Sequence, residues 1–151
     1  MGEAVLDIQD LSVSYDTERG PLHALRHVNL QIKPGRIVGI VGESGCGKST
    51  LISAIIRLLA PNARIDGGSV NWKGINLLDL DAEAMRALRG DEISMVFQDP
   101  MTSLNPVLTI GRQMTDVQHR DQRSLPEKRA RAIRMLERVD IPNPKEQLDR
   151  Y

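Results

Sequence analysis

The sequence has little of several residue types, and each shortage argues against a class of protein. Cysteine occurs once in 151 residues, at Cys46, which rules out an internal disulfide and suits a reducing compartment. Aromatic residues make up only 3%, too few for a surface on which nucleic-acid bases stack. Lys and Arg total 20 and Asp and Glu total 20, so no net charge favours nucleic acid or an anionic membrane.

Long apolar runs are also missing. The longest, residues 51–60, is interrupted by Arg57 and is far too short to span a bilayer. The N-terminus lacks a basic segment followed by an apolar one, so we expect no secretory signal. We therefore expect a soluble chain of one-domain size, whose contact with any membrane is made through a partner.

The pattern of apolar residues predicts an α/β protein. The expected strands are residues 5–15, 22–32, 36–41, 69–73 and 93–98, and the expected helices are residues 48–59, 82–88, 109–119 and 126–139. Residues 36–41 and 93–98 are almost wholly apolar, which is typical of strands buried on both faces.

A glycine-rich motif lies between an expected strand and an expected helix. Residues 42–49 read Gly-Glu-Ser-Gly-Cys-Gly-Lys-Ser and match G-x-x-x-x-G-K-[ST] at every fixed position. A chance glycine-rich turn is the alternative, but the strand before the motif and the helix after it are the context of a phosphate-binding loop. The motif therefore predicts the binding of a nucleoside triphosphate.

Each part of this phosphate loop, residues 42–50, has a physical task. Glycines let backbone amides converge on phosphate oxygens, and the N-terminus of the following helix adds partial positive charge. Lys48 brings a full positive charge toward the β- and γ-phosphates, and the Ser49 hydroxyl can ligate a bridging Mg²⁺. The predicted nucleotide-binding residues of the loop are Gly42, Ser44, Gly45, Cys46, Gly47, Lys48, Ser49 and Thr50.

Phosphate loops serve kinases, GTPases and many ATPases, so other residues must decide among these classes. Residues 95–106 read Met-Val-Phe-Gln-Asp-Pro-Met-Thr-Ser-Leu-Asn-Pro, and residues 12–15 read Ser-Val-Ser-Tyr. With the phosphate loop, these strings resemble an ATP-binding-cassette (ABC) transporter ATPase of the dipeptide, oligopeptide and nickel importer branch. The resemblance runs along the whole chain and implies an ABC-type P-loop NTPase fold, with ATP and Mg²⁺ as cofactors.

The resemblance gives roles to two residues outside the loop. Gln98 matches the Q-loop glutamine that touches Mg²⁺ and the attacking water in the family. Lys48 and Gln98 are therefore the expected catalytic residues, and Ser49 and Gln98 the expected metal ligands. Tyr15 matches the aromatic residue that stacks on adenine. The plainer interpretations are a polar residue at a strand end for Gln98 and a half-buried strand tyrosine for Tyr15.

By the same resemblance the chain is the N-terminal part of one nucleotide-binding domain. Residues 1–35 would form an antiparallel β subdomain, residues 36–98 a portion of the P-loop core, and residues 99–151 the Q-loop and the start of the helical subdomain. The sequence contains neither a Leu-Ser-Gly-Gly-Gln signature motif nor a Walker B strand with its two carboxylates. We therefore expect a fold truncated before the signature motif, and a chain that is catalytically incomplete by itself.

The expected function is the ATP-binding component of an importer for peptides or related solutes. The expected partners are membrane-spanning permease subunits, contacted through residues 98–120, and a second nucleotide-binding subunit in a homo- or heterodimer, with no nucleic acid. The protein would then be peripheral at the cytoplasmic face of the inner or plasma membrane. A small P-loop kinase and a non-catalytic nucleotide-binding protein stay open as alternatives, and assays of phosphate transfer and ATP hydrolysis separate the three.

Overall fold

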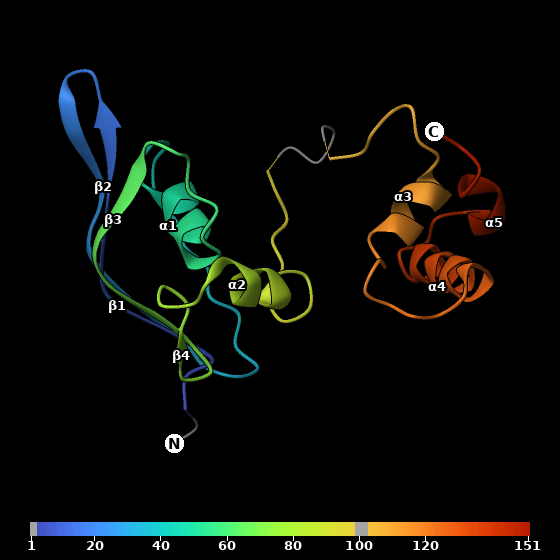
Figure 1. Ribbon diagram of the computed structural model, residues 1–151, viewed down its shortest axis with the longest axis horizontal. Coiled ribbons are helices and arrows are strands. Elements are labelled where there is room, and N and C mark those ends of the chain that lie inside the picture. The colour runs from blue at the N-terminus through green and yellow to red at the C-terminus, as the bar shows by residue number, and fades with distance from the viewer. Residues whose placement is uncertain (1–2, 99–102) are drawn as a thin grey trace. The chain divides into compact units, whose positions relative to one another are not determined.

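The computed structural model describes residues 3–98 and 103–151. The chain forms two compact units, one of residues 1–94 and one of residues 95–151 (Figure 1). The three-part division expected at residues 35 and 98 stays a prediction, because compactness alone does not define the subdomains of a family.

An antiparallel sheet is the main layer of the N-terminal unit, with the strand order β2-β1-β3-β4. The strands β1 (Leu6–Thr17) and β2 (Gly20–Ile32) form a hairpin, and β3 (Ala63–Trp72) pairs with the other edge of β1. The short β4 (Ile75–Asn76) pairs with β3. This sheet confirms the antiparallel β subdomain, to which β3 and β4 also contribute.

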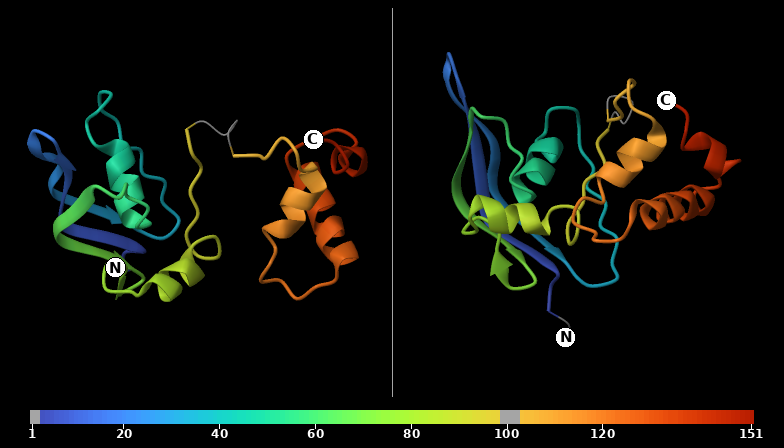
Figure 2. Two further views of the ribbon diagram at one scale, coloured as in Figure 1. Left: turned by 45° about the horizontal axis from the view of Figure 1, so that its top comes forward. Right: turned by 45° about the vertical axis from the view of Figure 1, so that its right-hand side comes forward.

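Two helices lie on the same side of this sheet (Figures 1 and 2). They are α1 (Lys48–Ile55) and α2 (Ala82–Leu88). The buried apolar residues of the unit are Leu6, Ile8, Leu11, Val13, Leu25, Leu51, Ala54, Ile56, Val70, Leu77 and Met85. Because these residues come from the sheet and from both helices, a single core holds the three together.

The bounds of α2 agree with the prediction, and the Asp81 carboxylate caps this helix by accepting the Ala84 N–H at 2.7 Å. The helix α1 is shorter than the predicted residues 48–59. Arg57 has a φ of 53°, which ends the helical path, and its side chain donates to the Leu77 and Leu80 carbonyls. The predicted strand 69–73 is instead the C-terminal part of β3, which pairs with β1 along most of its length.

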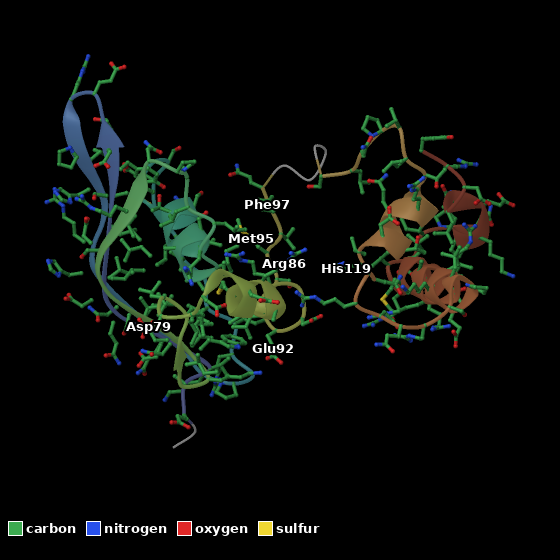
Figure 3. The ribbon with its side chains drawn as sticks, viewed as in Figure 1. Asp79, Arg86, Glu92, Met95, Phe97 and His119 are labelled. Carbon is green, nitrogen blue, oxygen red and sulfur yellow. The ribbon has the colours of Figure 1, made fainter. Side chains whose placement is uncertain are left out.

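The strands predicted at residues 36–41 and 93–98 are wrong for this structure. Within the described residues neither segment joins the sheet, and Ile37 and Val41 are 102% and 94% exposed. In the second segment Val96 and Phe97 are also exposed; Figure 3 shows the Phe97 side chain on the extended backbone. A β-type sequence needs a neighbouring strand for its backbone hydrogen bonds. Among the described residues these two segments have no such strand, and the second makes only an isolated bridge between Ile93 and Arg89.

The C-terminal unit consists of helices α3 (Ile110–Asp116), α4 (Leu125–Arg138) and α5 (Pro144–Gln147). The first two confirm the predicted helices, with ends shifted by a few residues. The short α5 has no counterpart among the expected helices. The sequence also predicts a turn-rich loop at residues 99–106, of which residues 99–102 lie outside the described residues.

Local signals explain where these helices begin. The Thr109 hydroxyl accepts the Arg112 N–H at the start of α3, and Ser124 and Glu127 form a capping box at the start of α4. The start of α3 packs against Leu148, whose carbonyl oxygen would lie 2.7 Å from a Cβ at Gly111. Only a glycine lets the backbone come this close.

Candidate nucleotide-binding site

The phosphate loop leads directly into α1. Gly45 and Gly47 have φ values of 81° and 95°, a left-handed conformation that glycine adopts without strain. A Cβ at Gly47 would lie 2.8 Å from the Ala24 carbonyl oxygen and 2.9 Å from Leu25 Cδ2. The loop therefore rests on the backbone of β2, and both the conformation and the contact require glycine at this position.

The Lys48 ammonium group folds back over the loop. Its Nζ donates to the carbonyl oxygens of Gly42 and Glu43, at 2.7 and 2.6 Å, and lies 3.4 Å from Cys46 Sγ. The side chain thus brings a full positive charge over the loop that the sequence predicts for phosphate. A Cβ at Gly42 would lie 2.7 Å from Cys46 Sγ, so the start of the loop is in close contact with its middle.

No side chain caps the N-terminus of α1, so no such group competes with a phosphate for its backbone amides. Its N-cap residue, Gly47, has no side chain to accept a hydrogen bond, and the first turn contains no acidic residue. The first backbone amides of a helix have no partner within the helix, and the helix dipole makes this end partly positive. The amides, the dipole and Lys48 together make this end of the helix positive, which suits the binding of phosphate.

Tyr15 lies next to the first turn of α1. Its hydroxyl is 3.1 Å from Thr50 Oγ1, and its side chain is half-buried. The structure therefore brings Tyr15 together with the phosphate loop, from elements 35 residues apart in the sequence. Stacking of Tyr15 on adenine stays a prediction.

Gln98 ends the extended segment of the C-terminal unit and is exposed. The phosphate loop belongs to the N-terminal unit, so a shared site of Gln98 and Lys48 stays a prediction. Among the described residues no cluster of His, Cys, Asp and Glu side chains has the geometry of a metal site. The Ser49 hydroxyl, exposed in the first turn of α1, is the group near the loop that suits Mg²⁺.

Sequence reasoning missed the residues that support the loop. Ala24 and Leu25 lie in the strand expected at residues 22–32, and both contact the position of Gly47. The alternating pattern indicates that a strand is present, but it does not say which distant loop rests on that strand. His27, also without a predicted role, is hydrogen-bonded to β1 through Ser12 and Asp10.

No helix among the described residues is both long enough and apolar enough to cross a bilayer.

Known proteins resemble the chain along its whole length. It is 45% identical to the probable peptide ABC transporter ATP-binding protein y4tR of Sinorhizobium fredii, across 99% of this chain and 45% of that protein. It is 44% identical to the probable D,D-dipeptide transport ATP-binding protein DdpD of Escherichia coli, across 100% of this chain and 47% of that protein. The chain thus spans just under half the length of these relatives.

Solved structures of ABC transporter cassettes also resemble the chain. A bacterial ABC transporter cassette, MJ0796, solved as a dimer, matches with a TM-score of 0.79 and 29% identity, over 96% of this chain and 60% of that one. The same cassette bound to ADP and phosphate matches equally well. The fold is therefore that of an ABC-type P-loop NTPase. A family model described as ABC transporter matches residues 25–151, and the chain belongs to this family.

Proposed function

We propose that the chain binds Mg-ATP at residues 42–50 and serves as the ATP-binding component of an importer for peptides or related solutes. The observation that carries this proposal is the position of Lys48, whose ammonium group lies over the loop at the uncapped N-terminus of α1. That arrangement suits the β- and γ-phosphates of a nucleoside triphosphate. The peptide and dipeptide transport names of the relatives support the class of solute.

The proposed contacts with ATP follow from the placement of each group. The loop amides and Lys48 hold the phosphates, with Gly42, Ser44, Gly45, Cys46 and Gly47 forming the cradle. Tyr15, beside Thr50, would stack on the base. The Ser49 hydroxyl would hold Mg²⁺, which neutralises charge on the phosphates, and Gln98 would complete the metal and water contacts.

The proposed partners are permease subunits and a second nucleotide-binding subunit. The segment 98–120 includes exposed apolar side chains at Leu104, Val107 and Val117, which are 58%, 74% and 76% exposed. Exposed apolar side chains of this size favour contact with another protein. The dimeric form of MJ0796 supports pairing with a second cassette. We place such a complex at the cytoplasmic face of the inner or plasma membrane.

Replacement of Lys48 tests the site. Lys48→Ala should lower the affinity for a fluorescent ATP analogue at least about tenfold, because the charged contact with the phosphates is lost. Lys33→Ala is the matched control, since Lys33 is an exposed lysine at the end of β2 outside the loop. Unchanged affinity in Lys48→Ala, or equal loss in both variants, would show that ATP does not bind at this loop.

Replacement of Gln98 tests the coupling role. In the assembled transporter, Gln98→Ala should lower transport per ATP hydrolysed more than it lowers ATP affinity, because the proposal places Gln98 between nucleotide and permease. An affinity loss as large as that of Lys48→Ala would contradict this role. For the 151 residues alone we propose binding without turnover, and steady phosphate release that Lys48→Ala removes would refute it.

A further inference from the structure

Two residues with a left-handed backbone face each other across β1 and β2. Asp10 has a φ of 55° and His27 a φ of 50°, which is uncommon for residues with a side chain. Each lies in a β-bulge. Between Ile8 and Leu11, β1 has one residue more than the opposing stretch of β2, and between Leu11 and Val13 the extra residue is on β2.

Hydrogen bonds join the two bulges into what we term the bulge clasp, made of Asp10, Ser12, His27 and Asn29. The Asp10 N–H donates to Asn29 Oδ1 and the His27 N–H donates to Ser12 Oγ, both at 3.0 Å. Asn29 Nδ2 donates to the His27 carbonyl at 3.0 Å, and His27 Nδ1 lies 2.7 Å from Asp10 Oδ1. A side chain of the opposite strand therefore accepts the backbone amide of each left-handed residue.

The third strand fixes the bulge from the other edge. Gly68 on β3 has a φ of 95°, and a Cβ there would lie 2.6 Å from the Asp10 carbonyl carbon and oxygen. The bulge of β1 is thus seated against β3 with no room for a side chain between them.

The bulge at Asp10 decides which face of the sheet receives the rest of β1. Leu6 and Ile8 are buried before it, and Leu11 and Val13 are buried after it. Strict alternation would have placed residues 10 and 12 in the core, because side chains of a strand alternate between two faces. Tyr15 lies two residues after Val13 and is half-buried, whereas Ser14 between them is fully buried, and the Tyr15 hydroxyl reaches Thr50 on α1.

We infer that the bulge clasp positions Tyr15 for the base of the bound nucleotide. This inference rests on the proposed function, since it assigns positioning residues to the same ATP site. The bulge on β2 ends at Leu25, whose Cδ2 would lie 2.9 Å from a Cβ at Gly47. The clasp therefore joins the strand that carries Tyr15 to the strand that supports the phosphate loop.

Comparison of two ligands tests the clasp. ATP offers a base and phosphates, whereas tripolyphosphate offers phosphates alone, and the affinity of each is measured by displacement of a fluorescent ATP analogue. His27→Ala and Ser12→Ala should weaken ATP about tenfold and leave tripolyphosphate within about twofold, because loss of base stacking has about this size. Tyr15→Ala should show the same selective loss, and His27→Asn, which tolerates a left-handed backbone, should retain more ATP affinity than His27→Ala.

Gln31→Ala is the control for a neutral change on β2, because Gln31 is exposed and pairs with Asp7 on the far side of the bulge. If circular dichroism shows that His27→Ala does not fold, the inference is tested with Ser12→Ala, which removes only the hydroxyl that accepts the His27 N–H. Equal weakening of both ligands, or no weakening of either, would overturn the inference while the proposed function stands. A native chain that binds neither ligand would refute the proposed function and the inference with it.

Discussion

Two stretches of the N-terminal unit have β-type sequences and opposite environments. β1 pairs with β2 and β3 and buries Leu6, Ile8, Leu11 and Val13. Residues 37–41, Ile-Val-Gly-Ile-Val, form no strand, and their four apolar side chains are exposed. The second stretch is the more apolar of the two, so hydrophobicity does not explain the difference.

The difference lies in where a partner strand comes from. β1 and β2 are joined by a tight turn at residues 18–19, so β1 finds its first partner a few residues away. A strand of parallel type pairs only across a long connection, and within the described residues nothing pairs with residues 37–41. Pairing with a neighbour, and not local propensity, therefore decides which β-type sequence becomes a strand.

The largest expected difference between the two stretches comes from replacing one isoleucine in each. Ile8 is 1% exposed and Ile37 is 102% exposed. Ile8→Ala should lower the free energy of unfolding by about 2–5 kcal/mol, because it leaves a cavity in the core. Ile37→Ala should change it by about 0.5 kcal/mol or less, because no packing is lost. Urea unfolding of both variants measures the two effects.

A similar loss in both variants would show that residues 37–41 pack against something in solution. A loss in neither would show that the sheet is not the stable part of the unit.

A second comparison replaces one glycine in the paired sheet and one in the unpaired stretch. Gly68→Ala adds a methyl group 2.6 Å from the Asp10 backbone at a φ of 95°, and should destabilise the unit by about 1–3 kcal/mol. Gly39→Ala lies in the unpaired stretch with open space around its Cβ, and should be neutral or slightly stabilising. Thermal unfolding checks both, and the comparison fails if Gly39→Ala is the more harmful change.

The sequence predicted most features that depend on local signals. The motif at residues 42–49, the strands at residues 5–15 and 22–32 and the helix at residues 82–88 are predictable because glycine spacing and the periodicity of apolar residues are local signals. The strands at residues 36–41 and 93–98 were predicted wrongly because a buried apolar strand depends on neighbours that the segment itself does not specify. The bulge clasp gave no signal, because Asp10 and His27 interrupt the alternation without a recognisable pattern.

The phosphate loop joins residues 37–41 to α1. The reactivity of its single thiol, that of Cys46, can be used to detect binding of the proposed ligand. Cys46 is exposed, and its Sγ lies 3.4 Å from Lys48 Nζ. Mg-ATP should therefore slow alkylation of Cys46 several-fold by covering the loop, as mass spectrometry after timed labelling would show. Lys48→Ala supplies the control, because protection should disappear with nucleotide binding. Equal labelling with and without Mg-ATP in the native chain would contradict the assignment of the loop.

The smallest expected effect concerns exposed ion pairs, which hold the connection between α3 and α4. Arg123 lies 2.6 Å and Arg131 3.4 Å from Asp121 Oδ2. The hydrogen bond from Arg123 lowers the pKa of Asp121 from 3.8 to about 2. A carboxylate with a lowered pKa stabilises the folded state above its unfolded pKa, and that contribution is lost as the pH falls through the folded value. The window here is therefore from about pH 4 down to about pH 2.

Asp121→Asn should remove this contribution, so acid unfolding of the variant should begin at a higher pH than that of the native chain. Below about pH 2 the variant and the native chain should be about equally stable, because Asp121 is then protonated in the native chain as well. Far-UV circular dichroism during acid titration follows the loss of helix. Asp140→Asn is the control, because the Asp140 carboxylate forms no ion pair within the described residues. Because exposed pairs contribute little, the effect should be smaller than that of Gly68→Ala. Acid titration curves that coincide for Asp121→Asn and the native chain would mean that packing alone holds the helical unit.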